Sequence, residues 1–247
     1  MNLLAIDTST EQMCLALIHQ GKIFSHEEPG GAAASARLLP CIEALLHESK
    51  LSLNQVQLIA YGMGPGAFTG LRTACSTAQG LAMGLGCPVL PLDSLRIVAH
   101  DAITQWGGNE AAVAVVMDAR MGEVYAGLYE LHQGRWQCLI APSLWKPALL
   151  QEHFLARSFN TPLIWAGTGL HLLQQDPSTP HPLASWTTYP QQVQRGRALA
   201  HCAVHTLQHE QPIDPSQALP LYARDKVAQT IEERRAQAQQ GQQVQLL

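Results

Sequence analysis

The chain has 247 residues, enough for one large domain or two smaller lobes. Hydrophobic residues make up 47% and charged residues 14%, a composition that excludes a disordered polypeptide. The formal net charge of −4 gives no overall attraction to nucleic acid and disfavours a tRNA-binding role carried by this chain alone. Six scattered cysteines without a Cys-x-x-Cys pair favour a reduced, cytosolic compartment. From the pattern of apolar and charged residues we expect neither a signal peptide nor a membrane span.

The first part of the sequence predicts a strand, a hairpin and a helix. Strands are expected at residues 3–7, 14–18 and 22–27, with a turn at Gln20-Gly21 between the last two. A helix is expected over 35–49, because apolar residues recur there at helical spacing: Leu38, Leu39, Ile42, Leu45 and Leu46.

A glycine-rich loop, Gly64-Pro65-Gly66-Ala67-Phe68-Thr69-Gly70, connects a strand at 58–61 to a helix from Thr69 to about Leu85. Its glycines allow close approach of a ligand or of a second backbone, and free N–H groups at a helix start attract anions. The loop matches neither a P-loop nor a dinucleotide fingerprint. Thr69 is interpreted as a helix cap rather than a nucleophile.

The helix after this loop is rich in small residues: Ala74, Ser76, Ala78, Gly80, Ala82 and Gly84. Each glycine lowers helix stability by up to about 1 kcal/mol relative to alanine. The composition therefore predicts that a neighbouring helix approaches closely. A strand at 88–92 and a helix capped by Ser94 complete this half of the sequence.

The same order of elements begins again after the break at 107–109. A strand over 111–117 ends at Asp118, as the strand 3–7 ends at Asp7, and hairpin arms follow at 123–131 and 136–140. This topological repeat predicts two similar lobes, 1–106 and 107–225. A strand at 163–166 and a helix at 191–208 follow, and the polar end, 226–247, is expected to be frayed or disordered.

Asp7 and Asp118 are the strongest candidates for chemistry, because each closes an apolar strand. In a two-lobed ATPase, such aspartates face a cleft and handle Mg-nucleotide. That chemistry favours glycine beside each aspartate, whereas Thr8 follows one and Ala119 the other. The alternative is that both carboxylates cap turns.

Three histidines, His201, His205 and His209, form an i, i+4, i+8 stripe on the last helix. Such a stripe can hold zinc, which leaves a metal-dependent peptidase as a hypothesis. The apolar residues on the opposite face favour a simpler interpretation, in which the histidines are the solvent side of an amphipathic helix.

Five segments together resemble the TsaB family, a subunit of the bacterial machinery that makes threonylcarbamoyladenosine in tRNA. They are Leu4-Ala5-Ile6-Asp7-Thr8-Ser9-Thr10, Leu38-Leu39-Pro40, the glycine loop continued through Leu71-Arg72, Asp118-Ala119-Arg120-Met121-Gly122-Glu123-Val124-Tyr125, and Pro220-Leu221-Tyr222-Ala223-Arg224. The resemblance covers residues 1 to about 225 in order.

The resemblance implies an α/β, actin-like fold of two lobes, each a mixed sheet with flanking helices. It implies a non-catalytic partner of the transferase TsaD, joined by the ATPase TsaE, a homodimer when TsaD is absent, and contact with tRNA only through the complex. No cofactor is expected on this chain alone, and ATP with Mg²⁺ only at the level of the complex. A standalone actin-like ATPase or kinase that uses Asp7 and Asp118 is the alternative.

The resemblance also implies site residues. The expected partner interface comprises Leu38, Leu39, Ile42, Leu45, Leu71, Arg72, Ala74, Cys75, Ala78, Leu81 and Ala82. The residues expected near a vestigial or shared phosphate site are Asp7, Ser9, Gly64, Pro65, Gly66, Thr69, Gly70 and Asp118.

The chain departs from the family at Ala67, where serine is usual, and at Ala34, where histidine is frequent. Ser94 and Val98 stand where TsaD-like proteins carry metal-binding histidines, so no metal site is expected there.

Overall fold

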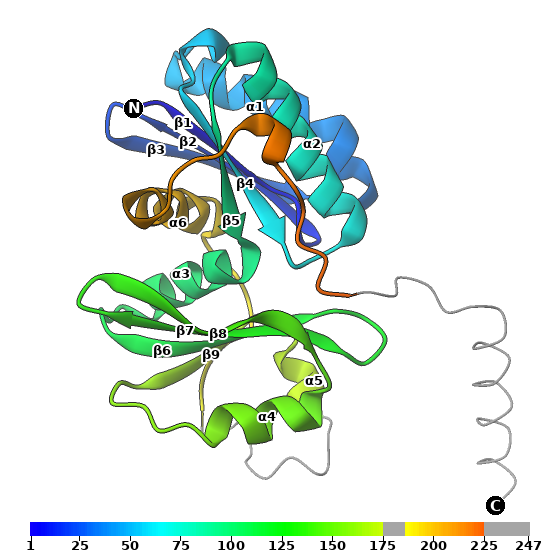
Figure 1. Cartoon of the computed structure of the whole chain (residues 1–247), viewed down its shortest axis with the longest axis vertical. Helices are drawn as coiled ribbons and strands as arrows, with labels where there is room; N and C mark the ends of the chain where they lie inside the picture. Colours follow the sequence, from blue (N-terminus) through cyan, green and yellow to red (C-terminus); the bar gives the residue numbers. More distant parts are fainter. Residues whose placement is uncertain (175–185, 225–247) are drawn as a thin grey trace, which may run out of the picture.

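A computed structural model describes residues 1–174 and 186–224, which form two lobes, each built on a five-stranded sheet (Figure 1). The first sheet has the order β3-β2-β1-β4-β5, and the second β10-β9-β6-β7-β8. The first sheet comprises β1 (Leu3–Asp7), β2 (Gln12–His19), β3 (Lys22–Pro29), β4 (Leu58–Gly64) and β5 (Val89–Asp93). The second comprises β6 (Ala111–Asp118), β7 (Val124–His132), β8 (Arg135–Trp145), β9 (Leu163–Ala166) and β10 (Thr187–Tyr189).

The two sheets repeat one topology. β1 pairs antiparallel with β2 and parallel with β4, and β6 pairs in the same way with β7 and β9. The last strand of each sheet, β5 or β10, is parallel to its neighbour. This arrangement confirms the predicted α/β architecture of two similar lobes, each with a mixed sheet.

Helices cover both faces of each sheet (Figure 1). Helices α1 (Ala34–Ser49) and α2 (Phe68–Leu85) pack on one face of the first sheet, where Leu4 and Ile6 of β1 point. Leu3 and Ala5 point to the other face, which α6 (Arg195–His209) covers. The alternation follows from the two-residue period of a strand.

The second sheet is covered by α3 (Ser94–Trp106) on one face, and by α4 (Pro147–Leu155) and α5 (Leu170–Gln174) on the other. Helices α4 and α5 and strand β10 were not predicted from the sequence. Helices α3 and α6 contact each other between the sheets. Asp93 rather than Ser94 caps α3, because its carboxylate accepts hydrogen bonds from the first backbone N–H groups of that helix.

The end of the described chain returns to the first lobe. Ile213 bridges to Val89 of β5, and the Leu221 N–H donates to the Met63 carbonyl at 2.6 Å. The second sheet begins after residues 107–109, where the chain was expected to pass into the second lobe. However, α6 and the segment 213–222, which were assigned to that second lobe, pack on the first. The predicted tail, 226–247, lies outside the described residues. Among the described helices, none is both long and apolar enough to span a membrane.

The small residues of α2 divide into two groups. Ala74, Ala78 and Ala82 are fully buried against the first sheet, so the chain's own packing explains them. Gly80 and Gly84 are exposed, and a Cβ placed on either meets nothing within 4 Å. The fold of this chain therefore does not require either glycine.

Gly70, in the first turn of α2, contrasts with Gly80 because a Cβ at Gly70 would lie 1.8 Å from the Thr8 carbonyl oxygen. We expect Gly70→Ala to lower the free energy of unfolding by about 3 kcal/mol or more, because backbone must move. Gly80→Ala should raise it by roughly 0.5–1 kcal/mol through helix propensity. Urea unfolding measures the free energy of unfolding of both variants. An equal change in the two would show that Gly70 is not in closer contact with its surroundings than Gly80.

Candidate functional site

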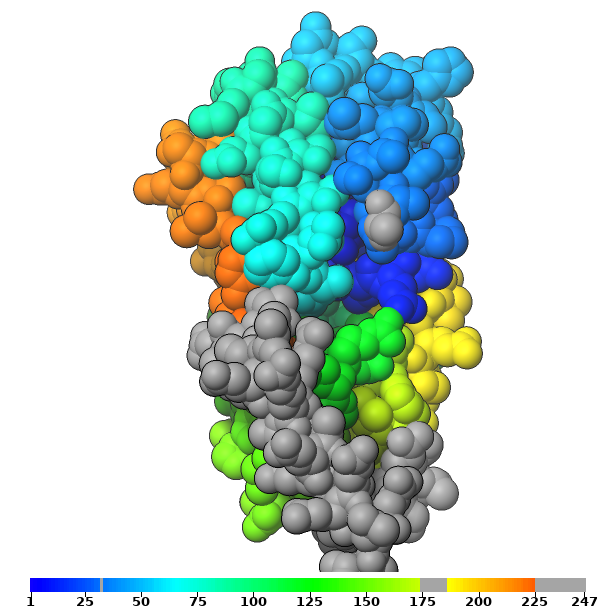
Figure 2. Space-filling view, turned by 90° about the vertical axis from the view of Figure 1, so that its right-hand side faces the viewer, coloured from blue at the N-terminus to red at the C-terminus, as the bar shows by residue number. Residues whose placement is uncertain are grey.

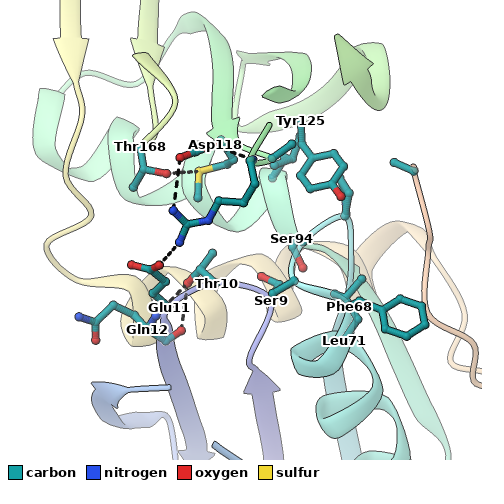
Figure 3. A pocket seen from close by; sticks show the side chains of 18 of the residues that line it. Ser9, Thr10, Glu11, Gln12, Phe68, Leu71, Ser94, Asp118, Tyr125 and Thr168 are labelled. Carbon is teal, nitrogen blue, oxygen red and sulfur yellow. Dashed lines mark hydrogen bonds and ion pairs between the residues drawn. The ribbon is translucent and has the colours of Figure 1, made fainter. Parts of the chain in front are cut away.

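A cavity of about 730 Å³ lies between the lobes (Figure 3). Its walls come from the loops that follow β1 and β6, from the start of α2, and from the segment before α6. Of the residues expected near a phosphate site, Ser9, Pro65, Gly66 and Asp118 line the cavity. The loops after the two repeated strands thus meet at this cavity, although Asp7, Gly64, Thr69 and Gly70 are not among its lining residues.

Asp7 and Asp118 form the same local structure in the two lobes. The Ser9 N–H donates to Asp7 Oδ1 at 2.7 Å, and the Arg120 N–H donates to Asp118 Oδ1 at 2.6 Å. Each carboxylate therefore caps the turn after its strand, which confirms the turn-capping alternative. Beyond the turn the two differ, since Asp7 is fully buried whereas the Asp118 side chain is 24% exposed at the cavity.

The second oxygen of Asp7 is taken by an arginine from α6. Arg195 Nη2 lies 2.7 Å from Asp7 Oδ2, and both side chains are almost completely buried. Burial disfavours the charged guanidinium, but the interactions with Asp7 and Cys14 together outweigh it and raise the pKa of Arg195. An aspartate that could have held a cation from solvent is thus neutralised by a cation of the protein itself.

Both terminal nitrogens of Arg195 make further hydrogen bonds, to the same turn and to the segment before α6. Nη2 also donates to Ser9 Oγ at 2.9 Å, while Nη1 donates to Thr10 Oγ1 at 3.0 Å and to Gln192 Oε1 at 2.6 Å. A buried guanidinium needs such partners, since an unpaired charge is strongly unfavourable. Arg195 therefore fixes the loop after β1 to the start of α6.

Two further carboxylates hold the start of α6 in place. Asp101 of α3, itself buried, accepts hydrogen bonds from the backbone N–H groups of Val193 at 3.0 Å and Gln194 at 2.8 Å. Glu27 of β3 accepts one from the Gly196 N–H at 2.7 Å. Because α6 has no side-chain cap of its own, these acceptors satisfy the free donors at its N-terminus.

The glycine loop packs against the turn after β1. A Cβ on Gly66 would lie 2.3 Å from the Ser9 carbonyl oxygen. One on Gly62, in the strand β4 before the loop, would lie 2.6 Å from the Asp7 carboxylate. Thr8 Oγ1 donates to the Gly70 carbonyl at 2.6 Å. Gly66 and Gly70 therefore allow close approach of a second backbone, which is one of the two uses expected of the loop glycines.

Two details of this loop differ from the sequence analysis or extend it. Thr69 is not the cap of α2, since the helix begins at Phe68 with Ala67 as its N-cap. Gly64 has φ = +116°, and its N–H donates to Ser94 Oγ at 3.1 Å. That bond gives Ser94 a role in the loop instead of the capping role expected for it.

Most residues of the expected partner interface lie in the core of the first lobe. The buried ones are Leu38, Ile42, Leu45, Leu71, Ala74, Cys75, Ala78 and Ala82. Leu39 is 52% exposed, Leu81 is partly buried, and Arg72 is exposed. Helical periodicity identified the apolar face of each helix, but that face packs on the chain's own sheet.

Two arginines that line the cavity, Arg120 and Arg224, were assigned no role from the sequence. Arg224 Nη2 lies 2.8 Å from Glu123 Oε2 and donates to the Ala119 carbonyl at 3.1 Å. Arg120 forms an ion pair with Glu11 across the lobes. Arg72 stacks 3.9 Å from the centre of the Phe68 ring. Sequence spacing gave no signal for the ion pairs of Arg120, Arg195 and Arg224, because Glu11, Asp7 and Glu123 are distant from them in sequence. Arg72 and Phe68, in contrast, are four residues apart in α2.

The histidine stripe is mostly solvent-facing, as the amphipathic interpretation predicted. His201 and His209 are exposed, and the half-buried His205 places Nε2 3.2 Å from the Gly134 carbonyl oxygen. Within the described residues, no cluster of three metal-ligating side chains includes the stripe. His205 instead packs beside His100 of α3, with ring centres 6.0 Å apart.

Three comparisons place this geometry among known proteins. The family model described as TsaD, tRNA N6-adenosine threonylcarbamoyltransferase, matches residues 17–161. The tRNA threonylcarbamoyladenosine biosynthesis protein TsaB of Escherichia coli (strain K12) is 36% identical over 171 residues, 68% of this chain and 72% of that protein. TsaB of Haemophilus influenzae is 42% identical over 125 residues, 51% of this chain and 52% of that protein.

Solved structures agree with the sequence relatives. The structure titled YeaZ from Pseudomonas aeruginosa has a TM-score of 0.78 and 35% identity, and the match covers 90% of this chain and 99% of that chain. The likeness extends over both lobes, because it covers nearly the whole described fold.

The buried ion pair at Asp7 can be tested by replacing its cation. Arg195→Met should lower the free energy of unfolding by about 3–5 kcal/mol, because it leaves a buried carboxylate without its partner. Asp7→Asn/Arg195→Met should be less destabilised than the sum of the two single variants. Chemical denaturation measures all three, and strict additivity would show that the groups do not interact.

The histidines between α3 and α6 should make stability depend on pH. Burial lowers the pKa of His100 well below 6.5 and also lowers those of His201 and His205, with Arg96 adding to the effect at His100. At pH values below 6.5, the unfolded chain therefore binds more protons at these histidines than the folded chain does. We expect full stability above pH 6.5 and a decline below it, by at most about 1.4 kcal/mol per pH unit for His100 and by less for the more exposed His201 and His205.

His100→Phe keeps a ring against Trp136, whose ring centre lies 4.6 Å from that of His100, but removes the titration. The slope of unfolding free energy below pH 6.5 should therefore be shallower in this variant, as measured by urea unfolding at several pH values. An unchanged slope would exclude His100 as a source of the acid sensitivity.

Proposed function

The chain belongs to the TsaB family of tRNA threonylcarbamoyladenosine biosynthesis proteins, and from this membership we propose that it is a non-catalytic subunit that pairs with the transferase TsaD. TsaE, the ATPase, joins this pair, and in the absence of TsaD the same surface joins two copies of the chain. The role of the subunit is to activate TsaD, and tRNA is reached through the complex.

The exposed side of α2 is the observation that carries this proposal. Gly80 and Gly84 are one helical turn apart and open to solvent, so they lower helix stability without any gain inside this chain. A second helix that packs across them would approach closely and supply that gain. Met83, 60% exposed, and Leu39 of α1, 52% exposed, provide apolar area beside them.

Figure 2 shows α1 and α2 at the surface of the first lobe, in blue and cyan. The proposed contact surface therefore consists of the outer residues of these helices: Leu39, Arg72, Ser76, Gly80, Leu81, Met83 and Gly84. The buried residues of the same helices, such as Ala78, support that surface from beneath. Contiguous exposed apolar surface on a soluble protein marks an interaction site.

The state of Asp7 supports the absence of catalysis by this chain. Asp7 Oδ1 accepts from the Ser9 N–H and Oδ2 pairs with Arg195, so neither oxygen is free for Mg²⁺. The arginine is permanently charged, and its release would leave two unpaired buried charges. These contacts disfavour a standalone ATPase or kinase that uses Asp7 and Asp118. In our proposal, ATP and Mg²⁺ belong to the complex.

Cellular placement follows the same reasoning. The cysteines are free, and all but Cys138 are buried, as in proteins kept reduced. We assign the protein to the cytoplasm, where tRNA modification takes place.

The contact surface can be tested with one long, charged side chain. Gly84→Arg should weaken the complex with TsaD by about tenfold or more, because the added side chain holds the helices apart. The chain itself should stay folded, since space above Gly84 is open. Size exclusion and titration calorimetry with TsaD of the same organism measure the change.

Val204→Arg is the matched control, because Val204 is 40% exposed on α6, away from α1 and α2. It should leave the affinity for TsaD unchanged. If Gly84→Arg binds TsaD as well as the unmodified chain, or if no mixed complex forms, the proposed surface is incorrect.

A further inference from the structure

A second group of chemically reactive side chains lies away from the cavity, between the edge strand β3 and helix α1. His26 and Glu28 alternate along β3, so they share one face of the sheet. They stand opposite Leu15 and Met13 of β2, which belong to the core beneath α1. Cys41 of α1 belongs to the same core and completes the group.

The three side chains lie close together. Their nitrogen, oxygen and sulfur ligand atoms are all within 4.8 Å of one another, and His26 Nε2 is 3.1 Å from Glu28 Oε2. Cys41 is 4% exposed, and its thiol interacts with the Glu28 carboxylate rather than with apolar atoms alone. A thiol, an imidazole and a carboxylate from two rigid elements are therefore directed at one point.

An arginine holds the carboxylate in the structure. Arg37 of α1 donates from Nε and Nη2 to the two oxygens of Glu28 at 2.9 and 3.1 Å. With His26, this pairing lowers the pKa of Glu28 to about 2. A salt bridge that braces α1 against β3 explains Arg37 and Glu28, but it does not explain why a histidine and a cysteine converge on the same carboxylate.

We propose that His26, Glu28 and Cys41 form a binding site for a divalent cation of the zinc class. Zinc takes imidazole nitrogen, thiolate sulfur and carboxylate oxygen together, whereas magnesium and calcium prefer oxygen ligands alone. His26 Nε2, Glu28 Oε2 and Cys41 Sγ supply three ligands, and water supplies the fourth from the exposed side of His26. The Cys41 thiol loses its proton to solvent as the metal–sulfur bond forms.

Arg37 competes with the metal for Glu28. Its side chain is 57% exposed, so it can turn to solvent when a cation takes the carboxylate. The competition gives the site a signature that an adventitious surface metal would lack, since removal of a positive charge outside the ligand set should raise the affinity. The bound ion would also link β3 to α1 and stabilise the folded chain by mass action.

The test is titration of the full-length, metal-free chain with zinc chloride, followed by calorimetry, and with cobalt chloride, followed by the absorption band of a cobalt–thiolate bond. We expect one ion per chain. Cys41→Ser, Glu28→Gln and His26→Ala should each weaken binding by about 100-fold or more. Arg37→Ala should strengthen it about two- to fivefold, the size expected for loss of an exposed ion pair.

Two variants serve as controls. Cys138→Ser removes the exposed cysteine and should keep the cobalt–thiolate band, and His209→Ala removes part of the histidine stripe and should leave zinc affinity unchanged. His26→Ala removes a part-exposed side chain, so it stays informative if Cys41→Ser does not fold. Absence of saturable zinc binding, persistence of the thiolate band in Cys41→Ser, or unchanged or weaker binding in Arg37→Ala would overturn the proposal.

Discussion

The buried pair of Asp7 and Arg195 is the interaction on which the centre of this molecule depends. It joins the end of β1 to the first turn of α6, elements that are 188 residues apart in sequence. A charge pair of this kind contributes little net stability compared with apolar packing, but it tolerates no loss of either member. It therefore specifies one arrangement: the turn after β1, the glycine loop above it and the start of α6 must come together.

The duplicated architecture shows what this interaction changes. Both lobes end their first strand in an aspartate that caps a turn, yet only Asp7 receives a buried cation, while Asp118 remains at the cavity wall. A symmetric pair of carboxylates facing a cleft would suit a metal and a phosphate. Here Asp7 is already neutralised by Arg195, and Gly66 and Gly70 beside it pack against the backbone of the turn after β1. In our proposal this chain presents a surface instead, and that surface is the outer side of α1 and α2, where the chain's own packing does not explain Gly80 and Gly84.

The sequence predicted the fold well and the site only in part, for identifiable reasons. Strand periodicity and the repeated aspartate gave the two sheets, because those signals are local. The short α5 and β10 carry too few residues to show a period. Leu38, Leu45 and Ala78 were assigned to a partner because an apolar helical face does not reveal whether it meets its own sheet or another molecule. Arg195 was missed because an arginine at a helix start is usually exposed, and only the folded chain brings Asp7 to it.

Titration calorimetry of the isolated chain with Mg-ATP shows whether Arg195 has replaced an external cation at Asp7. We expect no saturable binding of Mg-ATP to the unmodified chain. Tight, magnesium-dependent binding that is lost in Asp7→Asn would contradict it, since Asp7 would then hold a metal while Arg195 stands aside.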